Sequence, residues 1–504
     1  MPDKLHELVQ NLSGGEMRYF RQFAARSHKS SEKNYLHLFD EMVRLLKYDE
    51  TILVDRLKKK GVNTQFLAAD KNYLYRQIMK SLLIFYSEAR SGLQAKSLIG
   101  QIEILYHKGL YEHCSKLMRQ CKKLAQEKEQ FGLLVDLLHW QRKIEGIHYS
   151  LEQAENLFNE IEQALDKLNN YNAYNRLYYR IMLFRKQYNK IRTPEDLQHL
   201  NTIMQHPLLV SETCAKSKTA TIRYYEIYAN YYHLLQNKDL EYKANTQICA
   251  LLDDDYLQNS PFDYLAYFSR TLSLQQYVEP DKFEKTLEII KNLPSLLKSP
   301  TTGFYAMAFT YTARIEMNRA IKSKQFDSAL ALIEPQEKQL VKYNNFISDE
   351  FKMTACYHFA YIYLVHGNLA KALHYINNII NNFEETTRPD VYVYARIMQI
   401  LLHYELKNYR ILPYLVRSVT ELLQSRKNLF EPEKLVLKFF QKIHTVSNEK
   451  EHIQEINNLK KYFTDKISKN SLEYKILDYF DFIAWLNSKI NNTSFYQAML
   501  TQPS

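Results

Sequence analysis

Glycine and proline are scarce in this 504-residue chain, which contains 10 and 12 of them, respectively. Average usage would supply roughly three times as many. Sheet proteins and loop-rich enzymes need these residues at turns, so their scarcity argues against both classes. The composition therefore predicts an all-α chain of long helices joined by short connections.

Long apolar runs and paired cysteines are also missing. No run approaches the roughly 18 apolar residues of a membrane-spanning helix, and the opening MPDKLHELVQ mixes charges where a signal peptide would be apolar. We therefore predict a cytoplasmic protein without membrane insertion. The five cysteines form no CxxC pair, which favours reduced thiols that pack as small apolar side chains.

The charge balance is moderately basic. The chain has 67 lysines and arginines against 56 acidic residues, a formal net charge of +11. The excess is not gathered into one tail, so it permits an acidic partner without demanding one.

A repeat runs through most of the chain. Polar turns are each followed by one large apolar residue, and these anchor residues recur every 40 to 46 positions. Most residues nine and six positions before an anchor are apolar, as are most residues seven positions after it. The anchors are Tyr111, Leu151, Leu197, Leu240, Phe283, Phe326, Leu369 and Tyr409.

Spacings of three and seven place residues on one face of a helix, so each unit reads as two amphipathic helices joined by a tight turn. One such hairpin cannot bury its apolar face alone, whereas stacked hairpins can. The sequence thus predicts an all-α superhelical solenoid of about eight hairpins over residues 96–425. Residues 1–95 and 426–504 are expected to form helical caps at its two ends.

Residues 355–376, ACYHFAYIYLVHGNLAKALHYI, resemble a tetratricopeptide (TPR) repeat. Small Ala360, aromatic Tyr363, the Gly-Asn turn, small Ala372 and apolar Ile376 carry the resemblance. Residues 109–118 and 325–333 match nearly as well, although the period exceeds the usual 34 residues. The resemblance implies a TPR-like solenoid that binds a protein or peptide.

Near the start, LSGGE at residues 12–16 is one residue away from the LSGGQ signature of ABC-type ATPases. Such an enzyme also needs a phosphate loop, GxxxxGK[ST], and no glycine of this chain precedes Lys-Ser or Lys-Thr. We predict instead a capping box, in which Ser13 caps a helix and Glu16 closes the box.

Catalytic and metal motifs are also lacking. The sixteen histidines form no HExxH motif and no cysteine/histidine cluster with ligand spacing. Asp253, Asp254 and Asp255 lack the pattern of a calcium loop and are expected to form a solvated turn. The sequence predicts a non-catalytic protein without a cofactor.

Two basic rows lie on first helices of hairpins: Arg185, Asn189 and Arg192, and then Arg314, Asn318 and Lys322. Steps of about four residues align each row on one helix face. In TPR proteins that grip acidic peptides, a basic residue, an asparagine and a second basic residue recur on the inner face, and this resemblance implies a partner-binding role. Tyr357, His358 and Tyr361 occupy the next unit, where such clamps usually add Asn and Lys. A solvated outer row is the alternative interpretation.

Other features permit nucleic-acid binding. Residues 175–186 interleave arginine with tyrosine, and Lys434, Lys438 and Lys442 form another basic row. The run at residues 58–60 before Gly61 is basic, although lysines before a C-cap glycine ordinarily complement a helix dipole. The helices around Gly61 also permit a helix-turn-helix, but the second one is apolar through residues 82–85.

Together these observations predict a scaffold or adaptor that binds a protein or peptide segment in the groove of the solenoid, and the basic rows favour an acidic segment. A nucleic-acid-binding or transcription-regulatory solenoid is the alternative. Binding of nucleic acid would fall steeply with salt, which distinguishes the two.

Overall fold

A computed structural model describes residues 3–25, 33–45, 48–87, 91–188, 191, 194–298, 300–425, 431–443, 449–467 and 476–501. These residues form helices and connections, with no strand among them, which confirms the predicted all-α solenoid class. The chain divides into two compact units. Unit 1 comprises Met1–Lys190 and Gln198–Tyr305, and unit 2 comprises Ile191–Leu197 and Ala306–Ser504.

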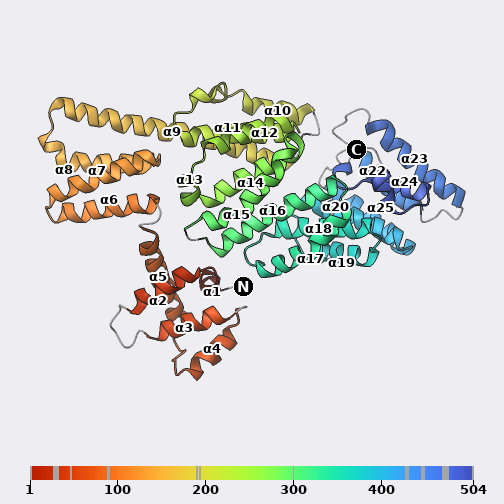
Figure 1. Cartoon of the computed structure of the whole chain (residues 1–504), viewed down its shortest axis with the longest axis horizontal. Coiled ribbons are helices and arrows are strands. Elements are labelled where there is room, and N and C mark those ends of the chain that lie inside the picture. Colours follow the sequence, from red (N-terminus) through yellow and green to blue (C-terminus); the bar gives the residue numbers. More distant parts are fainter. Residues whose placement is uncertain are drawn as a thin grey trace. The chain divides into compact units, whose positions relative to one another are not determined.

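The helices of unit 1 pack mainly against their chain neighbours, as in a solenoid (Figure 1). They are α1 (Lys4–Gln10), α2 (Gly14–Ala25), α3 (Lys33–Arg44), α4 (Glu50–Lys59), α5 (Leu67–Ser87), α6 (Ser91–His107), α7 (Tyr111–Glu127), α8 (Phe131–Glu145), α9 (Leu151–Tyr188), α11 (Lys218–Leu234), α12 (Lys238–Leu251), α13 (Asp254–Asn259), α14 (Pro261–Val278) and α15 (Phe283–Leu296), with short 3-10 turns η2 (Gly146–His148), η3 (Pro207–Leu209), η4 (Glu212–Cys214) and η5 (Pro280–Lys282).

Unit 2 has the same helix-after-helix arrangement. Two helices, α10 (Pro194–Met204) and α16 (Thr302–Lys322), cross the division between the units. The others are α17 (Phe326–Lys342), α18 (Asp349–Val365), α19 (Leu369–Asn382), α20 (Pro389–Glu405), α21 (Leu412–Ser425), α22 (Glu431–Ile443), α23 (Glu449–Ile467), α24 (Phe482–Ile490) and α25 (Phe495–Thr501), with the turn η6 (Tyr409–Ile411).

The anchors of the sequence repeat mark helix starts. Five of them are the first residue of a helix, two lie in the first turn, and Tyr409 opens the turn η6 that leads into α21. Pairs such as α11/α12, α18/α19 and α20/α21 pack against each other as hairpins. The five that begin a helix are Tyr111, Leu151, Phe283, Phe326 and Leu369, and the two in a first turn are Leu197 and Leu240.

Four hairpin turns share one backbone conformation. In each of them the residue two positions before the anchor has a positive φ, between 57° and 75°. These residues are Gly109, Lys324, Gly367 and Lys407. Each turn also closes with a hydrogen bond from the next N–H to a carbonyl five residues back, as between Asn368 and Tyr363 at 2.8 Å. This is the Schellman ending of a helix, which favours glycine because only glycine takes a positive φ without strain.

One predicted break between two consecutive hairpins is absent. Helix α9 runs without interruption over 38 residues, where the repeat places a break between two helices. No glycine or proline occurs between Leu151 and Tyr188, so nothing in the sequence ends the helix there. Its first residue, Leu151, is 80% exposed, so this anchor does not pack into a core as Phe326 does, which is 0% exposed.

The local motifs of the N-terminal helices have structural roles. Ser13 donates its backbone N–H to Glu16 at 2.6 Å and its hydroxyl oxygen accepts the Glu16 N–H at 3.3 Å, which confirms the capping box. Gly61 ends α4 with φ 75°, and Lys60 pairs with the buried Glu41 at 2.6 Å. Neither motif is free to hold a phosphate.

One smaller expectation is refined. Asp253, Asp254 and Asp255 are exposed, as expected, but they begin a helix: Asp253 caps α13, accepts from the Tyr256 N–H at 2.7 Å and pairs with Lys218 at 2.8 Å. The five cysteines are free thiols, as expected.

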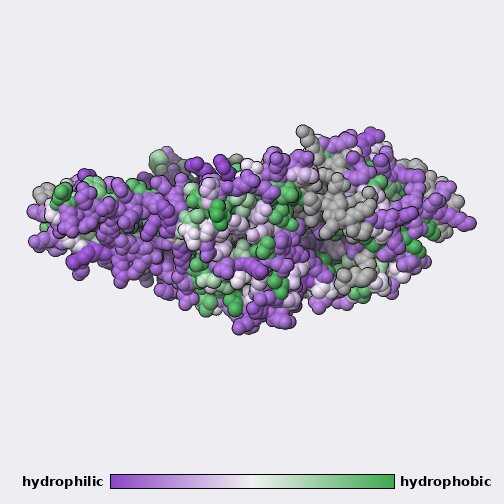
Figure 2. Space-filling model, turned by 90° about the horizontal axis from the view of Figure 1, so that it is seen from above, coloured by the Kyte–Doolittle hydropathy of each residue, from purple (hydrophilic) through white to green (hydrophobic). Residues whose placement is uncertain are grey.

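The core differs between the units. In unit 2 one continuous apolar cluster extends from α16 to α25, whereas unit 1 contains several separate clusters. The helices α1 to α5 have a cluster of their own around Phe20 and Phe39. Figure 2 shows one face of the molecule, on which hydrophilic residues predominate and hydrophobic ones form small separate patches.

Candidate partner-binding surfaces

The row of Arg314, Asn318 and Lys322 lies on α16, one helical turn between neighbours. Arg314 and Lys322 are exposed, and Asn318 is half-buried. The Arg314 guanidinium lies 5.5 Å from the centre of the Tyr311 ring one turn before it. The two cationic side chains thus lie at the surface of unit 2 and not in its core.

These cations act on a histidine of the neighbouring hairpin. His358 is on α18 and is half-buried. Burial, together with the positive charges of Arg388, Arg314 and Lys322, lowers the pKa of His358 to about 4. The positive charges of α16 and of the residue before α20 therefore act together on the middle of α18, where the His358 imidazole is neutral.

Arg388 is fixed at the start of α20. It makes a two-pronged ion pair with Asp390, at 2.9 and 2.7 Å, and also donates to the Thr354 hydroxyl at 3.3 Å. This pairing keeps the pKa of Asp390 below its usual value although burial opposes it. Tyr479 donates to the same carboxylate at 2.9 Å, which helps to fix the orientation of the ion pair.

The structure places Tyr357 and Tyr361 differently from the prediction. Both are 6% exposed, because the C-terminal residues 476–501 cover them. Tyr357 donates to the Tyr479 carbonyl at 3.1 Å, and the Tyr361 ring lies 5.8 Å from Phe480 and 6.4 Å from Phe495. These two tyrosines contact the protein's own chain and offer no surface to a partner in this arrangement.

The C-terminal segment returns along unit 2 and does not stop at its last helix. Trp485 of α24 is 1% exposed and donates to Glu405 of α20 at 2.6 Å. Tyr496 of α25 reaches farther back, donating to Asp327 of α17 at 2.8 Å and packing against His366, which directly follows α18. Residues expected to act only as an end cap thus line three earlier helices.

The first predicted row is only partly described. Asn189 and Arg192 lie outside the described residues. Arg185, on α9, is half-buried and donates to the Asn230 side chain on α11 at 2.7 Å. The predicted alignment of the three residues stays a prediction.

A second basic cluster, which was not predicted, contains Arg223, Glu226 and Arg270 on α11 and α14. Arg223 and Glu226 are spaced to meet on one helix, so this pair was detectable. Nothing in the spacing reveals that Arg270, two helices later, joins them.

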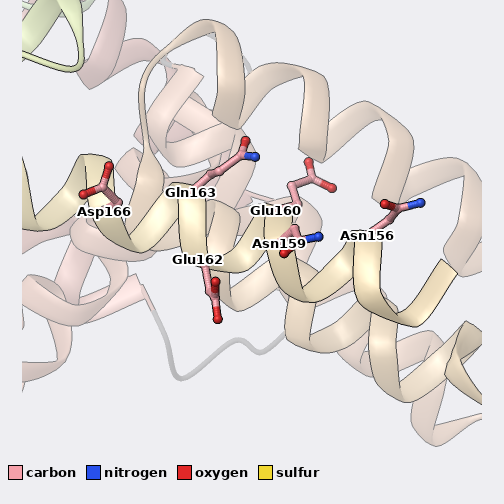
Figure 3. A pocket seen from close by; sticks show the side chains of 6 residues that line it. All are labelled: Asn156, Asn159, Glu160, Glu162, Gln163 and Asp166. Carbon is pink, nitrogen blue, oxygen red and sulfur yellow. The ribbon is translucent and has the colours of Figure 1, made fainter. Parts of the chain in front are cut away.

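Other surface features have simpler explanations. A shallow hollow on α9 is lined by Asn156, Asn159, Glu160, Glu162, Gln163 and Asp166, all from this one helix (Figure 3). Glu160 is paired with Lys122 at 2.6 Å and Asp166 with Lys216 at 2.7 Å, so the hollow brings no catalytic set together. In the lysine row of α22, Lys442 pairs with Glu455 at 2.6 Å and Lys434 with Glu431 at 3.6 Å.

Within the described residues, no group of three or more histidine, cysteine or acidic side chains is placed to hold a metal ion. No described helix combines the length and the apolar character needed to cross a membrane. No protein-family model matches the chain, and no curated protein is significantly similar to it in sequence.

Proposed function

We propose that this protein is a non-catalytic scaffold or adaptor whose unit 2 binds an acidic protein segment along α16, α18 and the start of α20. The observation that carries the proposal is the exposure of Arg314 and Lys322 on one face of α16, two turns apart. Their charges, with that of Arg388, also lower the pKa of His358 on α18, so the imidazole adds no further positive charge to this surface. Asn318, between the two exposed cations, supplies a neutral donor and acceptor to a peptide backbone.

The packing of residues 476–501 supports the same binding mode. The helices of unit 2 already hold a 3-10 turn and two short helices through aromatic contacts and hydrogen bonds to carbonyl and carboxylate oxygens. A partner segment bound in a groove between helices would be held by the same kinds of contact, namely aromatic packing and hydrogen bonds. The basic row lies on α16, and its charges act on His358, the residue after Tyr357 on α18. Because Tyr357 and Tyr361 are covered, a partner would contact the row and not these tyrosines.

The test is affinity capture with the full chain and with the triple variant Arg314→Ala/Asn318→Ala/Lys322→Ala, each with and without nuclease. Lys338→Ala/Lys342→Ala, on the exposed part of α17, is the matched control because it also removes two positive charges. Charge-assisted hydrogen bonds contribute about 1.5 kcal/mol or more each, so two lost contacts weaken binding by roughly 100-fold.

We expect the triple variant to lose a protein partner that wild type and the control retain regardless of nuclease. The partner is then confirmed by titrating its purified segment. Equal capture by the triple variant would refute the site. Release of all partners by nuclease would favour the nucleic-acid alternative.

A further inference from the structure

Helix α5 exposes a row of apolar side chains at the surface of unit 1. Tyr75, Met79 and Leu83 follow one another in steps of four residues, which places them on one face of the helix. Ile84 adjoins Leu83, and all four side chains are between 42% and 58% exposed. The buried residues of α5 pack instead against α2 and α3. The helix is therefore apolar on two faces, and one of them remains at the surface.

Two cations accompany this row. Arg76 and Lys80 are exposed, and each directly follows a member of the row, so they lie along the same side of the helix. Within the described residues neither of them pairs with an acidic side chain. We call these two cations and the four apolar residues the α5 stripe.

The first half of α9 exposes a second stripe, of the opposite charge. Leu151, Phe158 and Leu165 are spaced by seven residues, or about two helical turns, and are between 40% and 80% exposed. Glu155 and Glu162 each lie four residues after one of them, on the same face, and are exposed. Neither glutamate pairs with a basic side chain in the described part of the chain. We call these five residues the α9 stripe.

Two neighbouring acidic residues of α9 are already paired. Figure 3 shows Glu162 pointing to the opposite side of α9 from Glu160, which pairs with Lys122 of α7 at 2.6 Å. Asp166, next to the end of the stripe, pairs with Lys216 at 2.7 Å, so these two charges balance each other. The two glutamates of the α9 stripe take part in neither pair.

The two stripes are complementary. Each contains an apolar row, and the cations of one can meet the carboxylates of the other when the rows pack together. At a rise of about 1.5 Å per residue the rows are about 12 and 21 Å long, so the α5 row fits within the α9 row. Both stripes are exposed in the same folded chain, so they do not cover each other within it. A second copy of the chain offers the missing counterpart to each stripe.

We propose that copies of this protein associate through unit 1, with the α5 stripe of one copy packed against the α9 stripe of another. Burial of the apolar rows supplies the affinity, and the opposite charges disfavour pairing of two identical stripes. An anionic membrane is a poorer counterpart, because it attracts the α5 stripe and repels the α9 stripe. The association goes beyond the proposed partner binding, and it supplies one α16 row per copy, which strengthens binding of a multivalent partner.

Sedimentation velocity of the full chain over a series of protein concentrations tests the proposal, and the mass of the largest species gives the number of copies. Arg76→Glu/Lys80→Glu and Glu155→Lys/Glu162→Lys each place like charges opposite one another, so each is expected to raise the concentration at half-assembly at least tenfold. The variant with all four changes restores opposite charges and is expected to assemble like wild type. A one-to-one mixture of the two double variants should also assemble, since each supplies the stripe that the other needs.

Lys116→Glu/Arg119→Glu is the matched control. Both residues are exposed on α7, and their substitution makes the same change of charge outside either stripe, so assembly should match that of wild type. Leu83→Ser/Phe158→Ser removes apolar surface instead of charge. This variant should weaken assembly at both low and high salt, whereas the effects of the charge reversals should fade at high salt.

A wild-type chain that stays monomeric at every concentration would overturn the proposal. So would an assembly that only the α5 variant weakens, because α5 would then contact something other than α9. Failure of both the fourfold variant and the mixture to assemble, with circular dichroism showing folded variants, would refute the pairing as well. If a double variant does not fold, Arg76→Gln/Lys80→Gln or Glu155→Gln/Glu162→Gln replaces it and should weaken assembly severalfold.

Discussion

The depressed pKa of His358 makes a quantitative prediction about acid stability. The unfolded chain protonates this histidine with a pKa near 6.5, whereas the folded protein does so at about 4, because burial and the cations Arg388, Arg314 and Lys322 oppose a further positive charge. Above pH 6.5 both states are neutral at this site. Below it the unfolded state binds the proton first, so stability falls as the pH falls toward 4.

The size of the effect follows from the two pKa values. At pH 5 the unfolded state gains roughly 2 kcal/mol through this one group, and the full difference of about 3 kcal/mol is reached below pH 4. Replacing His358 by glutamine removes the proton-binding site while retaining a polar side chain. The variant should therefore lose about 2 kcal/mol less stability than wild type between pH 7.5 and pH 5.

The two tryptophans provide a suitable assay. Trp140 lies in unit 1 and Trp485 in the core of unit 2, so a Trp140→Phe background leaves fluorescence that reports on unit 2 alone. Urea unfolding is followed at both pH values with and without His358→Gln. The carboxylates that also titrate near pH 5 contribute equally to both proteins and cancel in the comparison. Parallel losses of stability in the two proteins would refute the proposed field around His358.

Three further predictions concern the turns, the C-terminal segment and the basic row. Lys407→Gly should raise the free energy of unfolding of unit 2 by about 1 kcal/mol in urea, because Lys407 has φ 60° and glycine takes that conformation without strain. A lower stability of the variant would show that contacts of the lysine side chain outweigh the backbone strain. Trp485→Phe should lower stability by about 2 kcal/mol in thermal or urea unfolding followed by circular dichroism, since the buried bond to Glu405 is lost, and an unchanged midpoint would argue against that contact. An acidic segment bound at the α16 row should raise the pKa of His358, which histidine NMR detects; a pKa unchanged by a bound segment would place the segment elsewhere.

The repeat made most helix starts predictable, because a hairpin turn needs both a polar stretch and an apolar residue that packs just after it. Phe326 and Leu369 illustrate this, since each follows a positive-φ residue and begins a helix. The same pattern was wrong for the interior of α9. The apolar periodicity of this segment fits one continuous helix as well as two separate ones. No glycine or proline is present to end the helix between Leu151 and Tyr188.

The sites were less predictable than the helices, because they depend on contacts between distant segments. Tyr357 and Tyr361 have the spacing of a helix face, but the sequence does not say that residues 476–501 return to cover that face. Likewise, Glu226 and Arg270 are 44 positions apart and carry no shared pattern. Local periodicity determines which way a side chain faces on its own helix, whereas the group it meets depends on tertiary packing.

One position of the repeat nevertheless recurs in these contacts. Arg185, Arg314 and Tyr357 each stand twelve residues before an anchor, and each acts beyond its own helix. Arg185 donates to Asn230 on α11, the charge of Arg314 acts on His358 of α18, and Tyr357 donates to the carbonyl of residue 479. In these three hairpins the position therefore faces the element next to the first helix. Arg185 meets a side-chain oxygen there and Tyr357 a backbone carbonyl, so the residue type at this position decides which group of the neighbouring element it contacts.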